Sequence, residues 1–220
     1  MKKIVFMGTP LFAVPILKSI FSKGYNIPLV YTQPPSKSNR GHKVSKSPIH
    51  KFCEENNLKV RTPENFKNLD DEKNILKKLE ADIAIVVAYG QILPKGILDV
   101  CDKGFINIHA SLLPKLRGAA PIQRSIMNLD NETGISIMQI NEKLDQGKVY
   151  SQYKIKINKD DNAKDLSFRL SNLAAEKIVD DIEGIFRNKK NFFEQDHSKA
   201  TYAIKIKKDE GRIDWNDKAE

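Results

Sequence analysis

Apolar segments with the character of buried strands alternate with helical segments along the first half of the chain. This alternation restricts the fold more than any other feature. The clearest strand, ADIAIVVA, spans residues 81–88, and a similar segment, KIVFM, spans 3–7. A segment with helical spacing of its apolar residues follows the first strand, over 12–21. Strands joined by helices form parallel sheets. The sequence therefore predicts an α/β fold with a doubly wound, mostly parallel sheet and helices on both faces.

The other predicted elements follow the same two periodicities. Further apolar strand-like segments are expected at 27–32, 58–60, 105–109, 135–140 and 149–157. Further helices are expected at 48–57, 70–80 and 163–187. The last of these carries a stripe of leucines and isoleucines, which is typical of a helix packed on a core. We interpret that stripe as core packing without a further role.

The character of the chain changes at about residue 189. Residues 1–188 are long enough for one domain with a core of its own. Residues 189–220 contain a Lys pair, a Phe pair and the segment TYAIKIKKDEGRIDW, and they end without a core. We interpret 189–220 as a linker and the start of a second domain that is mostly absent from this chain.

Charge and cysteine content restrict the partners and the compartment. The chain has 37 Lys and Arg against 28 Asp and Glu, a net charge of +9, which favours a polyanionic partner such as nucleic acid. A skewed base composition is the alternative, since Lys, Asn and Ile are abundant. Cys53 and Cys101 form neither a CxxC motif nor a disulfide framework, so a reducing cytosol is expected. No stretch approaches the roughly 20 apolar residues of a membrane helix.

The first predicted strand ends in Gly8-Thr9-Pro10, which has one glycine instead of the GxGxxG fingerprint. A dinucleotide site needs three glycines, for the turn, for the approach of the phosphates and for helix packing. The segment therefore argues against NAD or FAD. Gly8 is explained either by a plain tight turn or by a position that faces a ligand.

Two polar residues stand close together in the predicted strand FINIH at 105–109. Asn107 and His109 are two residues apart, so their side chains share one face of the strand. If they lie at the carboxyl end of a parallel strand, both face the crevice where open α/β sheets bind ligands. A satisfied polar pair in the core is the alternative interpretation.

The segment that follows favours the functional interpretation. Residues 111–121 (SLLPKLRGAAP) contain two prolines, a glycine and two cations, and they lack helical periodicity. Loops of this kind at a strand end commonly carry the groups that hold a substrate.

A carboxylate is available in the turn NEKLDQG at 141–147. Turn chemistry alone accounts for an Asp at the position of Asp145. Close to His109, however, this carboxylate would favour the imidazolium form. Asn107, His109 and Asp145 together could hold a carbonyl oxygen, stabilise a tetrahedral oxyanion and move a proton from an attacking amine.

Four segments resemble one enzyme family. SLLPKLRGAAPIQ (111–123) resembles the SLLP-x-x-RG signature of the 10-formyltetrahydrofolate-dependent formyltransferases. VFMGTPLFAVP (5–15) and IAIVVAYGQILPKGIL (83–98) are similar to the methionyl-tRNA formyltransferases in particular. TYAIKIKKDEGRIDW (201–215) resembles the segment that joins the catalytic domain of that family to a C-terminal barrel. The resemblance covers essentially the whole chain.

The resemblance implies a Rossmann-like formyltransferase fold over 1–188, with the chain cut at the start of an OB-like β-barrel domain. It implies a catalytic set that falls on Asn107, His109 and Asp145. It implies that the α-amino group of initiator methionyl-tRNA attacks the formyl carbon of 10-formyltetrahydrofolate, without a metal, in a cytoplasmic monomer. The positions expected to hold the folate are Val87, Ala88, Tyr89, Gly90, Ile92, Leu93, Ser111, Leu112, Leu113 and Pro114.

The segment at 34–51 (PPSKSNRGHKVSKSPIHK) is basic, has no acidic residue and has the Pro, Ser and Gly content of a loop. A solvated surface loop is one interpretation. The resemblance implies instead an insertion that contacts the tRNA acceptor stem, with Arg40, Gly41 and Lys43 as contacts. Arg117 and Gly118 belong to the loop at 111–121, called the signature loop from here on, and they are also expected to contact tRNA.

Three other functions stay open from the sequence. The same site could formylate a sugar nucleotide or glycinamide ribonucleotide, although the basic loop favours tRNA. A related enzyme could hydrolyse or oxidise the formyl group. A basic RNA-binding module without catalysis would make Asn107, His109 and Asp145 dispensable, and it leaves the loop at 111–121 unexplained.

Overall fold

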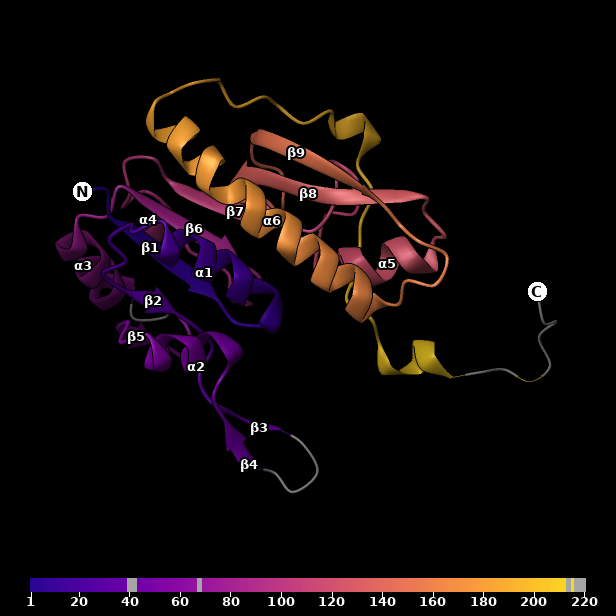
Figure 1. Ribbon diagram of the computed structural model, residues 1–220, viewed down its shortest axis with the longest axis horizontal. Coiled ribbons are helices and arrows are strands. Elements are labelled where there is room, and N and C mark those ends of the chain that lie inside the picture. Colours follow the sequence, from indigo (N-terminus) through magenta and orange to yellow (C-terminus); the bar gives the residue numbers. More distant parts are fainter. Residues whose placement is uncertain (39–42, 67–68, 213–214, 216–220) are drawn as a thin grey trace.

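The computed structural model describes residues 1–38, 43–66, 69–212 and 215, and within them a seven-stranded sheet forms the centre of the molecule (Figure 1). The strand order is β5-β2-β1-β6-β7-β8-β9. The strands from β5 to β7 are parallel, and β8 and β9 are antiparallel. Their bounds are β1 (Ile4–Gly8), β2 (Val30–Tyr31), β5 (Val60–Arg61), β6 (Ile83–Val87), β7 (Phe105–His109), β8 (Glu132–Gln139) and β9 (Val149–Lys156). The predicted doubly wound, mostly parallel α/β sheet is confirmed.

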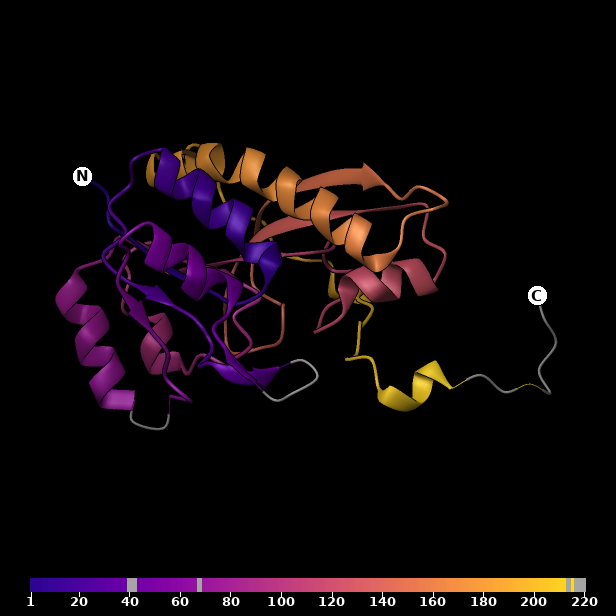
Figure 2. The ribbon, with the colours of Figure 1, turned by 60° about the horizontal axis from the view of Figure 1, so that its bottom comes forward.

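Helices cover both faces of the sheet, as predicted. On one face α1 (Val14–Ser22), α2 (Pro48–Glu55) and α6 (Ala163–Phe186) pack against the odd-numbered side chains of β6, such as Ile83. On the other face α3 (Leu69–Leu79) and α4 (Lys95–Leu98) pack against Ala84 and Val86. Figure 2 shows α1 and α6 side by side over the sheet. The sequence pattern did not predict α4 or the seven-residue α5 (Pro121–Met127), which is too short for a clear periodicity.

The long predicted helix is α6, and its ends follow from local chemistry. The side chain of Asn162 accepts hydrogen bonds from the backbone N–H groups of Lys164 and Asp165, and the Asp165 carboxylate accepts one in return from Asn162 N. This capping box satisfies N–H groups that the helix itself cannot pair. Leu166 and Ile178 on its stripe are fully buried, which confirms the packing interpretation.

The basic segment forms a small separate hairpin of β3 (Ser36–Ser38) and β4 (Lys43–Ser45). Figure 1 shows its strands extending away from the sheet beyond α2. Arg40 and Gly41 lie outside the described residues. Lys43 is the first residue of β4, and only its backbone is described.

The segment after α6 returns to the same body. Phe193 exchanges two backbone hydrogen bonds of 2.9 Å with Val149 at the edge of the sheet. Further along, Tyr202 forms an isolated parallel β-bridge with Arg117, and Ala203 is fully buried. The division at residue 188 stays a prediction, but residues 193–203 add to the packing around the loop that follows β7.

A buried carboxyl group of α6 links this helix to β9 and predicts a pH effect on stability. Asp181 is 5% exposed and accepts hydrogen bonds from Ser151 Oγ (2.7 Å) and Tyr153 Oη (3.0 Å). Burial raises the pKa of Asp181 above its ordinary value of 3.8. The protonated form therefore favours folding below pH 3.8, and this stabilisation is lost as the pH rises through the folded-state pKa.

We expect Asp181→Asn, which cannot ionise, to gain stability relative to the wild type as the pH rises from 3 to 7. Urea unfolding at each pH measures the difference in the free energy of unfolding. Asp180→Asn is the matched control, because Asp180 is the exposed neighbour on the same helix. A difference for Asp181→Asn that stays constant with pH would contradict the prediction.

Candidate active site

The carboxyl ends of β1 and β6 mark the topological switch point of the sheet. These two strands are neighbours, and the sheet continues from β1 to β2 in one direction and from β6 to β7 in the other. Such a switch point is where open α/β sheets bind ligands. Thr9 Oγ1 and Gln33 Nε2 both donate to the carbonyl of Tyr89, at 2.9 and 3.2 Å, and tie the loops after β1, β2 and β6 together.

Close packing explains why residue 8 is a glycine. A Cβ at Gly8 would lie 2.8 Å from the Phe6 ring and 3.1 Å from the carbonyl oxygen of Val87. This close approach of strand β6 accounts for the glycine without a ligand.

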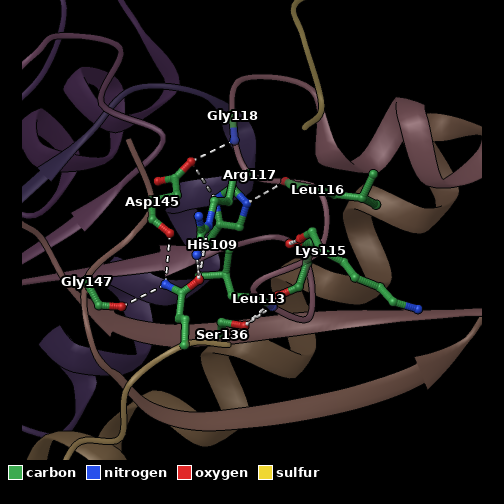
Figure 3. A network of polar contacts seen from close by, with 11 residues as sticks. His109, Leu113, Lys115, Leu116, Arg117, Gly118, Ser136, Asp145 and Gly147 are labelled. Carbon is green, nitrogen blue, oxygen red and sulfur yellow. Dashed lines mark hydrogen bonds and ion pairs between the residues drawn. The ribbon is translucent and has the colours of Figure 1, made fainter. Parts of the chain in front are cut away.

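Asn107 and His109 lie on one face of β7, as predicted from their spacing. His109 is 6% exposed. Its Nε2 lies 3.0 Å from the carbonyl oxygen of Leu116, and its Nδ1 lies 3.7 Å from Oδ2 of Asp145 (Figure 3). Asn107 is half-buried, and its side-chain amide has no hydrogen-bond partner within the described part of the chain. The amide is therefore available to a ligand.

Asp145 joins this pair from a loop 36 positions further along the chain, so the structure brings the predicted set together. Its Oδ2 accepts a hydrogen bond of 2.8 Å from the backbone N–H of Gly118. Both ring nitrogens of His109 thus face acceptors, Leu116 O and Asp145 Oδ2. The Nε2–H group donates to Leu116 O, whereas the Nδ1 to Oδ2 distance of 3.7 Å is an ion-pair separation longer than a hydrogen bond.

The signature loop is fastened to β8 beneath the site. Ser136 Oγ donates to the carbonyl of Ser111 at 2.6 Å and accepts from Leu113 N at 3.0 Å. Ser111 Oγ donates to the carbonyl of Lys115 at 2.6 Å. These bonds hold the loop in the course that carries Leu116 O to His109.

The predicted folate residues divide into accessible and buried groups. Ala88 and Gly90 are exposed, with left-handed φ angles of +45° and +84°, and the Ile92 side chain is 93% exposed. Pro114 and Leu112 are partly exposed. Four of these side chains are buried in apolar clusters, and their contact with folate stays a prediction: Val87, Tyr89, Leu93 and Leu113. Ser111 is also buried, 1% exposed, and its hydroxyl is used within the loop.

A cavity of about 450 Å³ lies beside the set, and the sequence pattern did not indicate it. Phe105 lines the cavity, and it lies on the same face of β7 as Asn107. Gln146 and Gly147, next to Asp145, line another wall, and Leu98 of α4 lines a third. The cavity therefore lies next to the loop that carries Asp145 and has apolar and polar walls, although Asn107, His109 and Asp145 do not line it.

Arg117 does not lie where a tRNA contact requires it. It is 1% exposed, and its Nη2 and Nε donate to Oε1 of Gln195 at 2.7 and 3.1 Å. A buried guanidinium cannot reach an RNA phosphate, which corrects the sequence-based assignment. The backbone N–H of Gly118 is likewise donated to Asp145. Gln195 and Thr201 were missed as site residues, and only Thr201 falls in a segment that the resemblance had marked.

The described residues contain no group of three or more His, Cys, Asp or Glu side chains placed to hold a metal ion. In the same part of the chain, no helix has the length and apolar character needed to cross a membrane.

The fold and this site place the chain in the class of formyl transferases, and residues 1–182 match the family described as formyl transferase. Two solved structures share the fold. An N-formyltransferase from Helicobacter canadensis has a TM-score of 0.72 at 22% identity, over 93% of this chain and 71% of that one. A phosphoribosylglycinamide formyltransferase from Streptococcus pneumoniae has a TM-score of 0.69 at 16% identity, over 84% of this chain and 99% of that one.

Sequence identity then selects the branch of the class. The chain belongs to the methionyl-tRNA formyltransferases: it is 62% identical to the Pelagibacter ubique protein of that name over 219 residues, 100% of this chain and 71% of the relative. It is 45% identical to the Parvibaculum lavamentivorans protein, over 97% of this chain and 68% of the relative.

Proposed function

We propose that this protein transfers the formyl group of 10-formyltetrahydrofolate to the α-amino group of initiator methionyl-tRNA, as a monomer in the cytoplasm. The observation that carries this proposal is the arrangement of Asn107, His109 and Asp145. An unpartnered amide lies two residues from an imidazole with acceptors at both ring nitrogens, and one of those acceptors is a carboxylate. Such a set suits acyl transfer from an amide-like donor to an amine.

In the reaction, the amine nitrogen forms a bond to the formyl carbon, and the bond from that carbon to N10 of the folate breaks. The Asn107 amide donates a hydrogen bond to the oxyanion of the tetrahedral intermediate. Protonated His109 donates a second one after one of its N–H groups turns from Leu116 O or Asp145 to the substrate. The Asp145 carboxylate orients His109 and accepts the amine proton, directly or through water. A proton returned to N10 completes the leaving group and balances the transfer.

The cavity beside β7 is the space that we assign to the folate ring system. A small-molecule site combines apolar walls with a few polar groups, in a volume of several hundred Å³. This cavity fits that description, with Leu98 and Phe105 on its apolar side and Asn141 on its polar side. The names of two structural neighbours include folinic acid and 5-N-formyl-THF, so related folds bind the same class of molecule.

We expect Leu98→Trp to raise the KM for 10-formyltetrahydrofolate about tenfold, because the larger ring would occupy part of the cavity. The KM for methionyl-tRNA should stay within about twofold of the wild type. Steady-state kinetics with each substrate varied in turn measures both constants. Leu129→Trp serves as the control, because Leu129 is 86% exposed and does not line the cavity. An unchanged folate KM in Leu98→Trp would argue against this placement.

The basic charge supports tRNA as the acceptor. The net charge of +9 favours a polyanion. The hairpin of β3 and β4 projects from the body (Figure 1), and its segment contains the proposed contacts Arg40, Gly41 and Lys43. The Pelagibacter ubique and Parvibaculum lavamentivorans relatives are both named methionyl-tRNA formyltransferase.

The test is formyl transfer from 10-formyltetrahydrofolate to three acceptors in parallel: charged initiator tRNA, an amino-sugar nucleotide and glycinamide ribonucleotide. We expect transfer to tRNA only, weakened as the salt concentration rises. Transfer to either small acceptor instead of tRNA would show that tRNA is not the acceptor. Transfer to none of the three would contradict the proposed formyl transfer itself.

A further inference from the structure

Asp145 has a left-handed backbone conformation, with a φ angle of +49°. Non-glycine residues adopt this region infrequently, although Asp tolerates it better than most. The loop that carries it, between β8 and β9, has other residues exposed, such as Glu142 and Lys143. A residue in such a conformation keeps it when surrounding contacts hold it. The contacts that hold Asp145 are therefore part of what sets its position relative to His109.

The side chain of Gln195 supplies two of these contacts. Its Nε2 donates to the carbonyl oxygen of Asp145 at 2.8 Å and to that of Gly147 at 2.7 Å. The two amide hydrogens are thus both used, one on each side of Gln146. Gln195 is 5% exposed, so water does not readily replace these bonds.

Arg117 determines which way the Gln195 amide points. Its Nε and Nη2 both donate to Oε1 of Gln195, and a guanidinium has no acceptor atom. The carbonyl oxygens of Asp145 and Gly147, in contrast, can only accept hydrogen bonds. Only one orientation of the Gln195 amide, oxygen toward Arg117 and nitrogen toward the loop, satisfies all four contacts.

The two chain neighbours of Arg117 contact two members of the proposed catalytic set, Asp145 and His109. Gly118 donates its N–H to Asp145 Oδ2, and Leu116 accepts from His109. The backbone of Arg117 is held by residues beyond α6: its N–H donates to Thr201 O at 2.9 Å, and its carbonyl accepts from Ala203 N at 2.7 Å. The segment 195–203 thus supports the site from a part of the chain outside the family match at 1–182.

We propose that Gln195 is a positioning residue for Asp145 and that Arg117 holds Gln195 in the orientation that this requires. The inference rests on the proposed function for its effect on rate. Gln195 does not itself line the cavity beside β7, but its partner Gly147 does, so it acts on the site through the position of the segment 145–147. Its loss should lower kcat more than it raises the KM for 10-formyltetrahydrofolate.

The sharpest variant is Gln195→Glu, which keeps the shape and the oxygen that faces Arg117. It replaces the donor to the loop by a second oxygen, which faces the carbonyls of Asp145 and Gly147. We expect kcat for methionyl-tRNA to fall about 10- to 100-fold. The KM for the folate should rise by a smaller factor than kcat falls, and the midpoint of thermal unfolding should stay near that of the wild type, because Arg117 keeps an acceptor. Asp196→Asn, at the exposed neighbouring position, is the matched control and should retain the wild-type kcat.

A second measurement is independent of activity. Hydrogen–deuterium exchange should become faster in peptides covering 141–147 in Gln195→Glu, but not in peptides covering β6. Faster exchange with a reduced kcat supports the proposal. Wild-type exchange in that loop, a wild-type kcat, or a loss of kcat matched by a loss of thermal stability would overturn it. If the wild-type protein formylates no amine, the proposed function fails, and the exchange result still decides whether Gln195 holds the loop.

Discussion

Replacing His109 with alanine should lower kcat for formyl transfer about 100- to 10,000-fold. The substitution removes the only imidazole beside Asp145 within the described residues, and with it the donor to the oxyanion. It also leaves the Leu116 carbonyl and Asp145 Oδ2 without their ring partner. The folate KM should change much less than kcat, because no atom of His109 lines the cavity beside β7.

Single-turnover formylation of charged tRNA measures this effect without interference from product release. The matched control is His50→Ala, which removes an imidazole from α2, away from the site, and should retain kcat within about twofold. A His109→Ala enzyme with near wild-type turnover would show that the histidine is a core residue. It would also favour the non-catalytic RNA-binding alternative.

The second large effect is expected at Gly118, where a single methyl group should disturb both stability and catalysis. The φ angle of Gly118 is +116°, and a Cβ there would lie 2.8 Å from the backbone oxygen of Ala203. Relief of this contact requires a shift of the Gly118 backbone, which withdraws its N–H from Asp145 Oδ2. We expect Gly118→Ala to lose about 1–3 kcal/mol of stability and at least about tenfold in kcat.

Urea unfolding and steady-state kinetics measure the two parts of this effect. Gly24→Ala separates strain from contact, because Gly24 also has a left-handed φ of +86°, but a Cβ there would meet nothing within 4 Å. Gly24→Ala should lose stability from the backbone conformation alone and keep the wild-type kcat. A Gly118→Ala enzyme with wild-type kcat would show that the hydrogen bond to Asp145 does not matter for the reaction.

These predictions depend on contacts that differ in how visible they are from the sequence. Asn107 and His109 share a face because a strand has a period of two residues, and that period is local. The signature loop is marked by its prolines and its glycine. Its detailed role was not visible, because Arg117 has the residue type of a phosphate ligand but the environment of a core residue. Burial of a charged side chain depends on which distant segment covers it, here the one containing Gln195.

The folate assignments show the same division. A resemblance identifies a stretch such as 87–93, but the strand period alone does not say which of its side chains point inward. Tyr89 and Leu93 pack in the apolar cluster under α3 and α4, whereas Ile92 is exposed. The cavity beside β7 has walls from α4, from β7 and from the loop that carries Asp145, three segments with no common sequence signal.

Short-range periodicity and turn chemistry were enough to predict four features from the sequence alone. They are the α/β class, the parallel arrangement, the long amphipathic helix and the Asn-His pair on one strand. Each depends on residues within a few positions of one another. Only the tertiary structure decided that Asp145 meets His109, that Arg117 is buried, and that residues 195–203 return to support the loop after β7. These facts depend on contacts between residues 36 to 86 positions apart, such as His109 with Asp145 and Arg117 with Ala203. Contacts at such separations arise when the apolar faces of helices and strands pack together, and no local pattern encodes them.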